Sequence, residues 1–186
     1  MRNIRGVTEL PQVICWDPPW QPKDKLPGKS RGAGRNYRTL STEEICAFPL
    51  PPLQDDAIMF LWRLSAMQED ALQVVRAKGF RTVSEVVWDK LTKNGLPWFG
   101  MGRYVRAAHE TAIIAVRGRP RLLESRKKVR SRFSASVPVN DRGRYIHSGK
   151  PEYFYRLIVE RISRGPYVEL FARQQREGWT CLGDIR

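Results

Sequence analysis

Short apolar runs alternate along this chain with segments of helical periodicity, and this alternation limits the possible folds more than any other feature. Six runs have the length and composition of strands: residues 12–16, 57–62, 82–88, 111–116, 167–171 and 179–182. Several of them are apolar throughout, which is typical of strands covered on both faces in a parallel sheet. The pattern predicts an α/β domain, in which ligands bind at the carboxyl ends of the strands.

Three helices are predicted between these strands. Residues 41–44 (STEE) form a capping-box signature that opens a short helix. Apolar residues at helical spacing from Met67 indicate a second helix, which should stop at Gly79. A third helix should begin at Pro151 and end before Gly165. With 186 residues and no internal repeat, the chain is expected to form a single domain over residues 1–186.

Several classes of protein are disfavoured by what the sequence lacks. No apolar run approaches the roughly 18 residues of a membrane span, and the first ten residues have no signal-peptide apolar segment. The cysteines Cys15, Cys46 and Cys181 form no C-x-x-C pair. We therefore expect no metal site and a location in a reducing cytoplasm. With two histidines in the chain, acid–base chemistry based on histidine is not expected.

The charge of the chain points to an anionic partner. Thirty-three Lys and Arg residues against nineteen Asp and Glu residues give a net charge of +14 and a pI near 10.3. The excess is concentrated in two stretches, at about residues 21–38 and 117–140, which are expected to be basic loops. They are read either as plain solvated loops or as segments that grip a phosphate backbone, and the overall charge favours the second. Neither stretch is an amphipathic helix, which disfavours a membrane surface.

The sequence DPPW follows the first predicted strand and raises a question about its purpose. It is either a stiff turn whose Trp20 packs into the core, or a site. A site could act on the exocyclic amine of a nucleobase: the Asp17 carboxylate and the Pro18 carbonyl would accept the two amine hydrogens, so that the nitrogen lone pair is freed. Trp20 would offer a face on which the base stacks, worth about 1–3 kcal/mol. On this reading Asp17, Pro18, Pro19 and Trp20 are the catalytic residues.

The DPPW motif resembles the signature of amino-methyltransferases that use S-adenosylmethionine. The segments LSTEEICAFPLPPLQDDAIMFLW, VVWDK, HETAIIAVRG and HSGKPEYFYRLIVERISRGPYVELFARQQREGWTCLGD are similar to the mRNA N6-adenosine methyltransferase family, and most similar to its compact prokaryotic and phage members. The resemblance implies a Rossmann-like, single three-layer domain. It also implies a circularly permuted order, in which the catalytic motif precedes the cofactor motif.

The resemblance also assigns binding residues. Glu169 ends a buried strand, where an acid suits the ribose hydroxyls of a cofactor, although an ion pair with Arg173 is an alternative. The implied S-adenosylmethionine site comprises Asp17, Lys150, Glu169, Arg173, Gln174, Gly183, Asp184 and, through an N-terminal segment, Ile4. The family often has asparagine where Asp184 stands. The implied residues for the target nucleotide are Trp20, Asn36, Tyr37, Arg103, Tyr104 and Arg106.

Three functions are compatible with these features. The first is transfer of a methyl group to the N6 amine of adenine in DNA, for which a duplex substrate would need its adenine flipped out. The second is the same reaction on RNA adenosine. The third is a non-catalytic nucleic-acid-binding subunit, which is disfavoured because such subunits of the family have lost DPPW. We expect a prokaryotic or phage-encoded protein, with a homodimer possible. The recognition sequence is not encoded in any motif that we can interpret.

Overall fold

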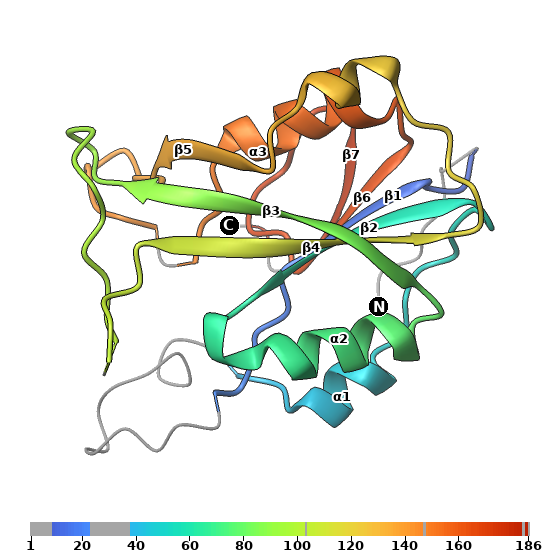
Figure 1. Ribbon diagram of the computed structural model, residues 1–186, viewed down its shortest axis with the longest axis horizontal. Coiled ribbons are helices and arrows are strands. Elements are labelled where there is room, and N and C mark those ends of the chain that lie inside the picture. Colours follow the sequence, from blue (N-terminus) through green and yellow to red (C-terminus); the bar gives the residue numbers. More distant parts are fainter. Residues whose placement is uncertain (1–8, 23–37, 103, 147, 184, 186) are drawn as a thin grey trace.

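The computed structural model describes residues 9–22, 38–102, 104–146, 148–183 and 185. Their core is a sheet of seven strands in the order β5-β3-β4-β2-β1-β6-β7 (Figure 1). The strands are β1 (Val13–Trp16), β2 (Ala57–Arg63), β3 (Arg81–Leu91), β4 (His109–Arg117), β5 (Arg132–Ser136), β6 (Tyr167–Leu170) and β7 (Trp179–Leu182). The helices are α1 (Thr42–Ala47), α2 (Gln68–Ala77) and α3 (Glu152–Leu157), with short turns η2 (Ser65–Met67), η3 (Glu124–Lys128) and η4 (Ile158–Ile162).

The sheet is mixed, which corrects the prediction of a parallel sheet. Strand β1 runs parallel to β2 and β6, but β4 lies antiparallel between β2 and β3. The continuous apolar run in β4 reflects burial on both faces, and an antiparallel strand in the middle of a sheet is buried in the same way. Strand β5 pairs parallel to β3 and was missed, because Phe133 is its only fully buried residue.

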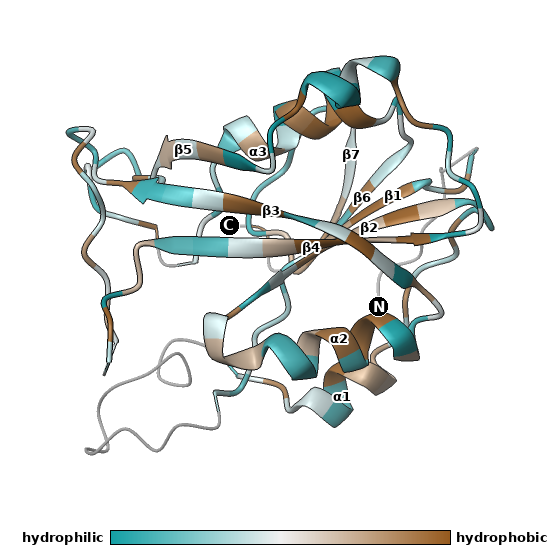
Figure 2. Cartoon of the chain, viewed as in Figure 1, coloured by the Kyte–Doolittle hydropathy of each residue, from teal (hydrophilic) through white to brown (hydrophobic). Residues whose placement is uncertain are grey.

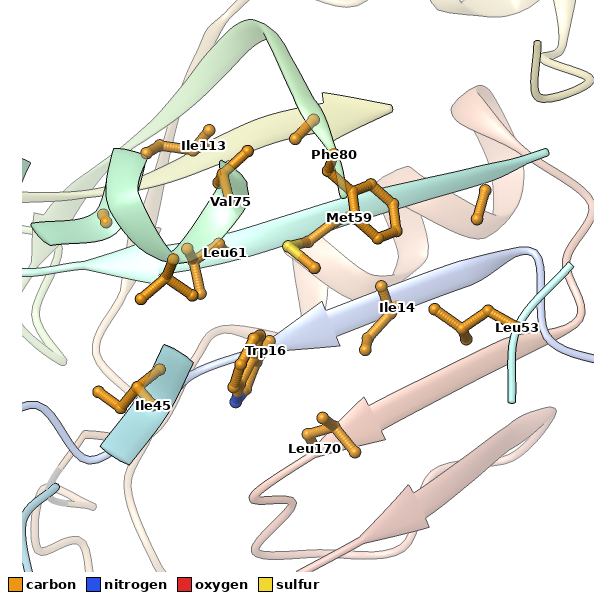
Figure 3. Packing of buried hydrophobic residues seen from close by; sticks show 14 of the residues in the cluster. Ile14, Trp16, Ile45, Leu53, Met59, Leu61, Val75, Phe80, Ile113 and Leu170 are labelled. Atoms are coloured by element: carbon orange, nitrogen blue, oxygen red, sulfur yellow. The ribbon is translucent and has the colours of Figure 1, made fainter. Parts of the chain in front are cut away.

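Two separate hydrophobic clusters cover the two faces of the sheet, and this confirms an α/β domain of three layers. Successive residues of β1 point to opposite faces. Ile14 and Trp16 pack with α1 and α2, as Figure 3 shows in close-up. Val13 and Cys15 pack with α3 and η4. Figure 2 shows the central strands as mostly hydrophobic, whereas hydrophilic and hydrophobic residues alternate along α2. Burial of each large apolar side chain contributes about 1.5–3 kcal/mol, so the central strands anchor the domain.

The helices begin as the sequence predicts. The Ser41 side chain caps α1 by accepting the Glu44 N–H, and the Glu44 carboxylate accepts the Ser41 N–H, which completes the capping box. Pro151 is the N-cap of α3, and the helix continues through the π-helical turn η4. Among the described residues, no helix combines the length and the apolar character that a membrane crossing requires.

The second basic stretch, residues 117–140, is not simply a loop. It includes the turn η3 and the strand β5, and its apolar residues Leu122 and Phe133 pack against the core. The prediction of a loop is therefore wrong for this stretch. Most of the first basic stretch, residues 23–37, lies outside the described residues.

Candidate active site

The chain turns sharply at the carboxyl end of β1, and the backbone of the DPPW motif is fixed on both sides of this turn. The Trp20 N–H donates to the Pro18 carbonyl at 2.8 Å, which closes a three-residue turn centred on Pro19. The Pro19 carbonyl accepts from the Leu40 N–H at 2.8 Å. Because proline has no N–H, the turn cannot extend the sheet. The Pro18 carbonyl keeps one lone pair for a ligand.

The indole of Trp20 lies in the core rather than over an open site. It is 4 % exposed and belongs to the hydrophobic cluster between the sheet and the helices α1 and α2. Its Nε1 donates to the Trp62 carbonyl at 2.8 Å. The prediction that Trp20 offers a free face for stacking is therefore wrong for this structure. The physical reason is the hydrogen bond to the Trp62 carbonyl of β2, which gives the buried indole N–H the partner that it needs.

Asp17 is held by a lysine from the other end of the chain. Lys150 Nζ lies 2.6 Å from Asp17 Oδ2 and 3.3 Å from Glu110 Oε2. The lysine side chain is only 5 % exposed, and its ammonium group lies 5.2 Å from the ring centre of Trp62. Burial alone would lower the pKa of Lys150, but the two carboxylates raise it above its ordinary value. Burial raises the pKa of Asp17, and Lys150 opposes that shift. Lys150 thus favours the charged form of Asp17 and limits the rise in its pKa that burial causes.

Glu110 extends this pair into a chain of alternating charges. Its Oε1 accepts from Lys90 Nζ at 2.7 Å, while its Oε2 faces Lys150. The Lys90 ammonium lies 5.2 Å from the ring centre of Trp88 and 5.4 Å from that of Trp98. Burial would raise the pKa of Glu110, but the two ammonium groups lower it to about 2. The chain runs Lys90–Glu110–Lys150–Asp17 and carries no net charge.

Glu169 stands on β6, the strand next to β1, and lies close to Asp17. It pairs with Cys15, two positions before Asp17. Its Oε1 accepts from the Tyr155 hydroxyl at 2.6 Å. It forms an ion pair with Arg176, at 3.7 Å, a partner that the alternative reading, which named Arg173, did not include. Arg176 also lies 3.5 Å from the ring centre of Tyr155. Burial raises the pKa of Glu169, and Tyr155 and Arg176 oppose the shift. Glu169 Oε2 is buried and accepts no hydrogen bond from the residues that the structure describes.

The other residues assigned to the cofactor follow β6 and β7. Arg173 is near enough to Asp17 to favour its charged form. Gln174 lies against Arg176, and with its amide oxygen turned toward the guanidinium it accepts at 2.9 Å. Gly183 packs against the backbone after β6, where an added Cβ would stand 2.3 Å from the Ala172 carbonyl oxygen. The residues Asp184 and Ile4 lie outside the described residues.

The residues assigned to the target nucleotide are described only in part. Asn36, Tyr37 and Arg103 lie outside the described residues. Tyr104 is 91 % exposed, and the guanidinium of Arg106 lies 5.2 Å from the ring centre of Phe99. Both belong to the segment between β3 and β4. At the base of this segment, the Lys90 N–H donates to the Ala108 carbonyl. This hydrogen bond lies at the same edge of the sheet as Asp17.

Four residues of the site were missed by reasoning from the sequence. They are Lys90, Glu110, Tyr155 and Arg176. Lys90 and Glu110 become neighbours only through the antiparallel pairing of β3 and β4, which the sequence did not predict. The signal for Arg176 was available, because a buried acid at the end of a strand needs a cationic partner nearby. Among the described residues, no group of three or more His, Cys, Asp or Glu side chains could hold a metal ion.

Comparison with known proteins identifies relatives that align with most of this chain. The N(6)-adenosine-methyltransferase MT-A70-like protein of Arabidopsis thaliana is 25 % identical over 176 residues, which are 92 % of this chain and 23 % of that protein. The N(6)-adenosine-methyltransferase catalytic subunit METTL3 of Homo sapiens is 27 % identical over 177 residues, which are 92 % of this chain and 27 % of METTL3. The human N(6)-adenine-specific methyltransferase METTL4 is 26 % identical over 195 residues, covering 99 % of this chain and 39 % of METTL4.

This chain thus spans about a quarter of the length of the first two relatives. The sequence profile described as MT-A70 matches residues 11–185, a range that includes both the DPPW corner and the Glu169 strand. Because the match extends over nearly all of the chain, the protein belongs to the MT-A70 family.

Proposed function

We propose that this protein transfers a methyl group from S-adenosylmethionine to the N6 amine of adenine in DNA. The observation that carries the proposal is the Asp17–Lys150 pair at the carboxyl end of β1, directly beside the buried acceptor of Glu169 at the end of β6. Two adjacent parallel strands thus present an acceptor for an amine and an acceptor for a ribose at one edge. The amine-binding residue precedes the ribose-binding residue in the chain, which supports the proposed permuted order.

The residues at this edge fit S-adenosylmethionine. A buried carboxylate oxygen without a donor is costly, and the ribose hydroxyls of a cofactor would supply the missing hydrogen bonds to Glu169 Oε2. Lys150, Arg173 and Gln174 would hold the remaining polar groups of the cofactor, and the close packing at Gly183 would keep the adenine side of the site narrow. When bound, the cofactor supplies an electrophilic methyl group.

In the proposed reaction, Asp17 makes the amine nitrogen of the target adenine a better nucleophile. The lone pair of an exocyclic amine is delocalised into the base, so its nitrogen is a poor nucleophile. The Asp17 carboxylate would accept one amine hydrogen, and the free lone pair of the Pro18 carbonyl the other. These bonds strengthen as positive charge develops on nitrogen, so they stabilise the transition state more than the bound substrate. The Asp17 carboxylate could also take the proton that the amine releases.

RNA is the second candidate substrate. The relatives from Arabidopsis thaliana and the human METTL3 are both named adenosine methyltransferases, whereas METTL4 is named adenine-specific and aligns over nearly all of this chain. We favour DNA on the resemblance of the whole domain to compact prokaryotic and phage members. The excess of 14 positive charges suits either polyanion.

The test is methyl transfer from labelled S-adenosylmethionine to matched oligonucleotides of one sequence. Single-stranded DNA, duplex DNA and single-stranded RNA are compared, and the product nucleosides are separated by mass spectrometry. The proposal expects N6-methyldeoxyadenosine as the main product. A product confined to RNA would move the proposal to the second candidate, and no methylated adenine with any substrate would overturn it.

Two matched variants test whether methyl transfer depends on Asp17. Asp17→Asn removes the negative charge and keeps the size of the side chain, and loss of one charge-assisted hydrogen bond costs about 1.5–3 kcal/mol, or roughly a 10- to 150-fold loss of kcat. Asp89→Asn is the control, because Asp89 is also paired with a cation, Arg132, and stands on β3 away from β1. Equal activity of the two variants would refute the role of Asp17.

A further inference from the structure

A cavity lies between the sheet and the segment that follows β4, on the face covered by α3. Its volume is about 220 Å³. Buried side chains of β2 and α3 line its inner end, among them Ile58, Phe60 and Phe154. Exposed residues line its outer end, among them Val83 and Arg130. The cavity is thus a pocket that is closed and apolar inside and open to solvent, and no described residue of the candidate active site lines it.

The mouth of the pocket results from the short pairing between β5 and β3. Strand β5 is the edge strand of the sheet and pairs only with Val87–Leu91. The preceding part of β3, residues 81–86, has no strand on that side in the part of the chain that the structure describes. The mouth lies beside this free part of β3, because Val83, Ser84 and Glu85 all line the pocket and are exposed.

Hydrogen bonds at both ends hold the roof of the pocket, which is formed by residues 122–131. Near its start, the Leu123 N–H donates to the Ile162 carbonyl at 2.8 Å, which joins the roof to η4. The corresponding gold and orange segments lie together at the top of Figure 1. At its end, the Ser131 carbonyl accepts from the Val87 N–H of β3 at 2.7 Å. Because both ends are tied to other elements, the roof spans the pocket without closing on the sheet.

The floor of the pocket is apolar surface that the protein itself covers only in part. Ile114 and Val116 are partly buried, although β4 has a neighbouring strand on each side. Both side chains line the pocket. An apolar cavity of about 150 Å³ is large enough to bind benzene, so this pocket has room for a chain of about eight carbon atoms. Covering such surface with an apolar ligand is favourable.

The mouth of the pocket carries an excess of positive charge. Arg126 and Arg130 both line it. Arg126 lies 3.5 Å from Glu124, but a neighbouring lysine holds the same carboxylate more closely, at 2.7 Å. Arg130 forms no ion pair among the described residues. The acid that lines the pocket, Glu85, is already paired with Arg63 at 3.3 Å. A ligand with a negative charge at the mouth would therefore meet unmatched cations.

We propose that this pocket binds a small amphiphilic anion, with an alkyl or aryl chain of about eight carbon atoms inside and a carboxylate beside Arg130. The chain would cover the partly buried side chains of β4. The carboxylate would accept charge-assisted hydrogen bonds from the guanidinium groups at the mouth. The inference goes beyond the proposed function and does not depend on it.

Three small molecules supply the test. Octanoate has both the chain and the charge, octanol has the chain alone, and butyrate has the charge with a shorter chain. Calorimetry at low salt measures their binding to the native protein. We expect one octanoate per chain with a Kd on the order of 100 µM. Octanol should bind about 10-fold more weakly, because it lacks the charge-assisted hydrogen bonds. Butyrate should show no measurable binding, because its chain covers too little apolar surface.

Matched variants separate the charge from the cavity. Arg130→Gln removes the cation at the mouth, so octanoate should then bind no more tightly than octanol. Lys128→Gln is the control, because Lys128 is a cation of η3 that does not line the pocket, and its Kd for octanoate should change less than about 2-fold. Val129→Phe fills the pocket from its roof and should weaken both octanoate and octanol at least about 10-fold.

The outcomes are distinct from those that test methyl transfer. Losses in Arg130→Gln and Val129→Phe support the pocket even if the protein methylates nothing. No saturable binding of octanoate overturns the inference, as do equal losses in Arg130→Gln and Lys128→Gln. If Val129→Phe does not fold, nuclear Overhauser effects between the terminal methyl group of octanoate and the methyl groups of Ile58 and Ile114 decide instead. Their presence supports the pocket, and their absence overturns it.

Discussion

Replacing Glu110 by Gln tests the alternating chain of charges that supports Asp17. Glu110 Oε1 and Oε2 each face an ammonium group, and its pKa is lowered from 4.5 to about 2. A lowering of about 2.5 pKa units corresponds to about 3.4 kcal/mol at 1.36 kcal/mol per unit. Because the side chain is 24 % exposed, solvent screens part of this, and we expect Glu110→Gln to lower the free energy of unfolding by about 2–3 kcal/mol at pH 7.

The pH dependence identifies the cause. A carboxyl group whose pKa is lower in the folded protein stabilises it above the unfolded pKa of about 4.5 and loses that effect as pH falls through about 2. The difference between the native protein and Glu110→Gln should stay nearly constant from pH 7 to 5 and fall below half by pH 3. Urea unfolding followed by tryptophan fluorescence measures it.

Glu85→Gln is the matched control for this variant. Glu85 also pairs with a cation, Arg63, at 3.3 Å, but its side chain is 50 % exposed. An exposed pair contributes at most about 1 kcal/mol. If Glu110→Gln costs no more than Glu85→Gln, or if its cost does not change between pH 7 and pH 3, the chain of charges is not a source of stability and the reasoning fails.

Three further substitutions follow from the geometry of the site. Tyr155→Phe removes the hydroxyl that lowers the pKa of Glu169. The affinity for S-adenosylhomocysteine, measured by calorimetry, should fall about 10-fold at pH 8. It should fall further at pH 6, because Glu169 then becomes protonated more readily. Gly183→Ala places a Cβ 2.3 Å from the Ala172 carbonyl, so both the free energy of unfolding, by about 1–3 kcal/mol, and cofactor affinity should fall. Trp20→Phe removes the hydrogen bond to the β2 carbonyl and should lower the free energy of unfolding by about 1–3 kcal/mol in a urea titration.

The sequence predicts much of the fold because its strand and helix signals are local. The capping box at Ser41 and the apolar runs of β2 and β4 depend on neighbouring residues, and the structure confirms them. Strand direction depends on contacts between distant segments, so the antiparallel β4 was not predicted. The strand around Phe133 was not predicted either, because four of its five residues are not fully buried.

The sequence likewise predicted one part of the candidate site and not the other. The pairing of Asp17 with Lys150 agrees with the resemblance that assigned both to one site. The part played by Glu110 follows from the register of β3 and β4, which no motif encodes. The position of Trp20 depends on a carbonyl of β2 more than forty residues later, and residue type alone could not distinguish a stacking ring from a buried one.

The Trp20–Leu40 bridge bears on how substrate preference could change. Gln21 N–H donates to the Leu40 carbonyl at 3.0 Å, so the two ends of the segment between them lie side by side. Lengthening a segment between two joined ends costs little, about 0.6 kcal/mol for each doubling. Insertions and substitutions between Gln21 and Leu40 can therefore accumulate without moving Asp17. Selection could exchange what the protein recognises while the turn that carries Asp17 is inherited intact.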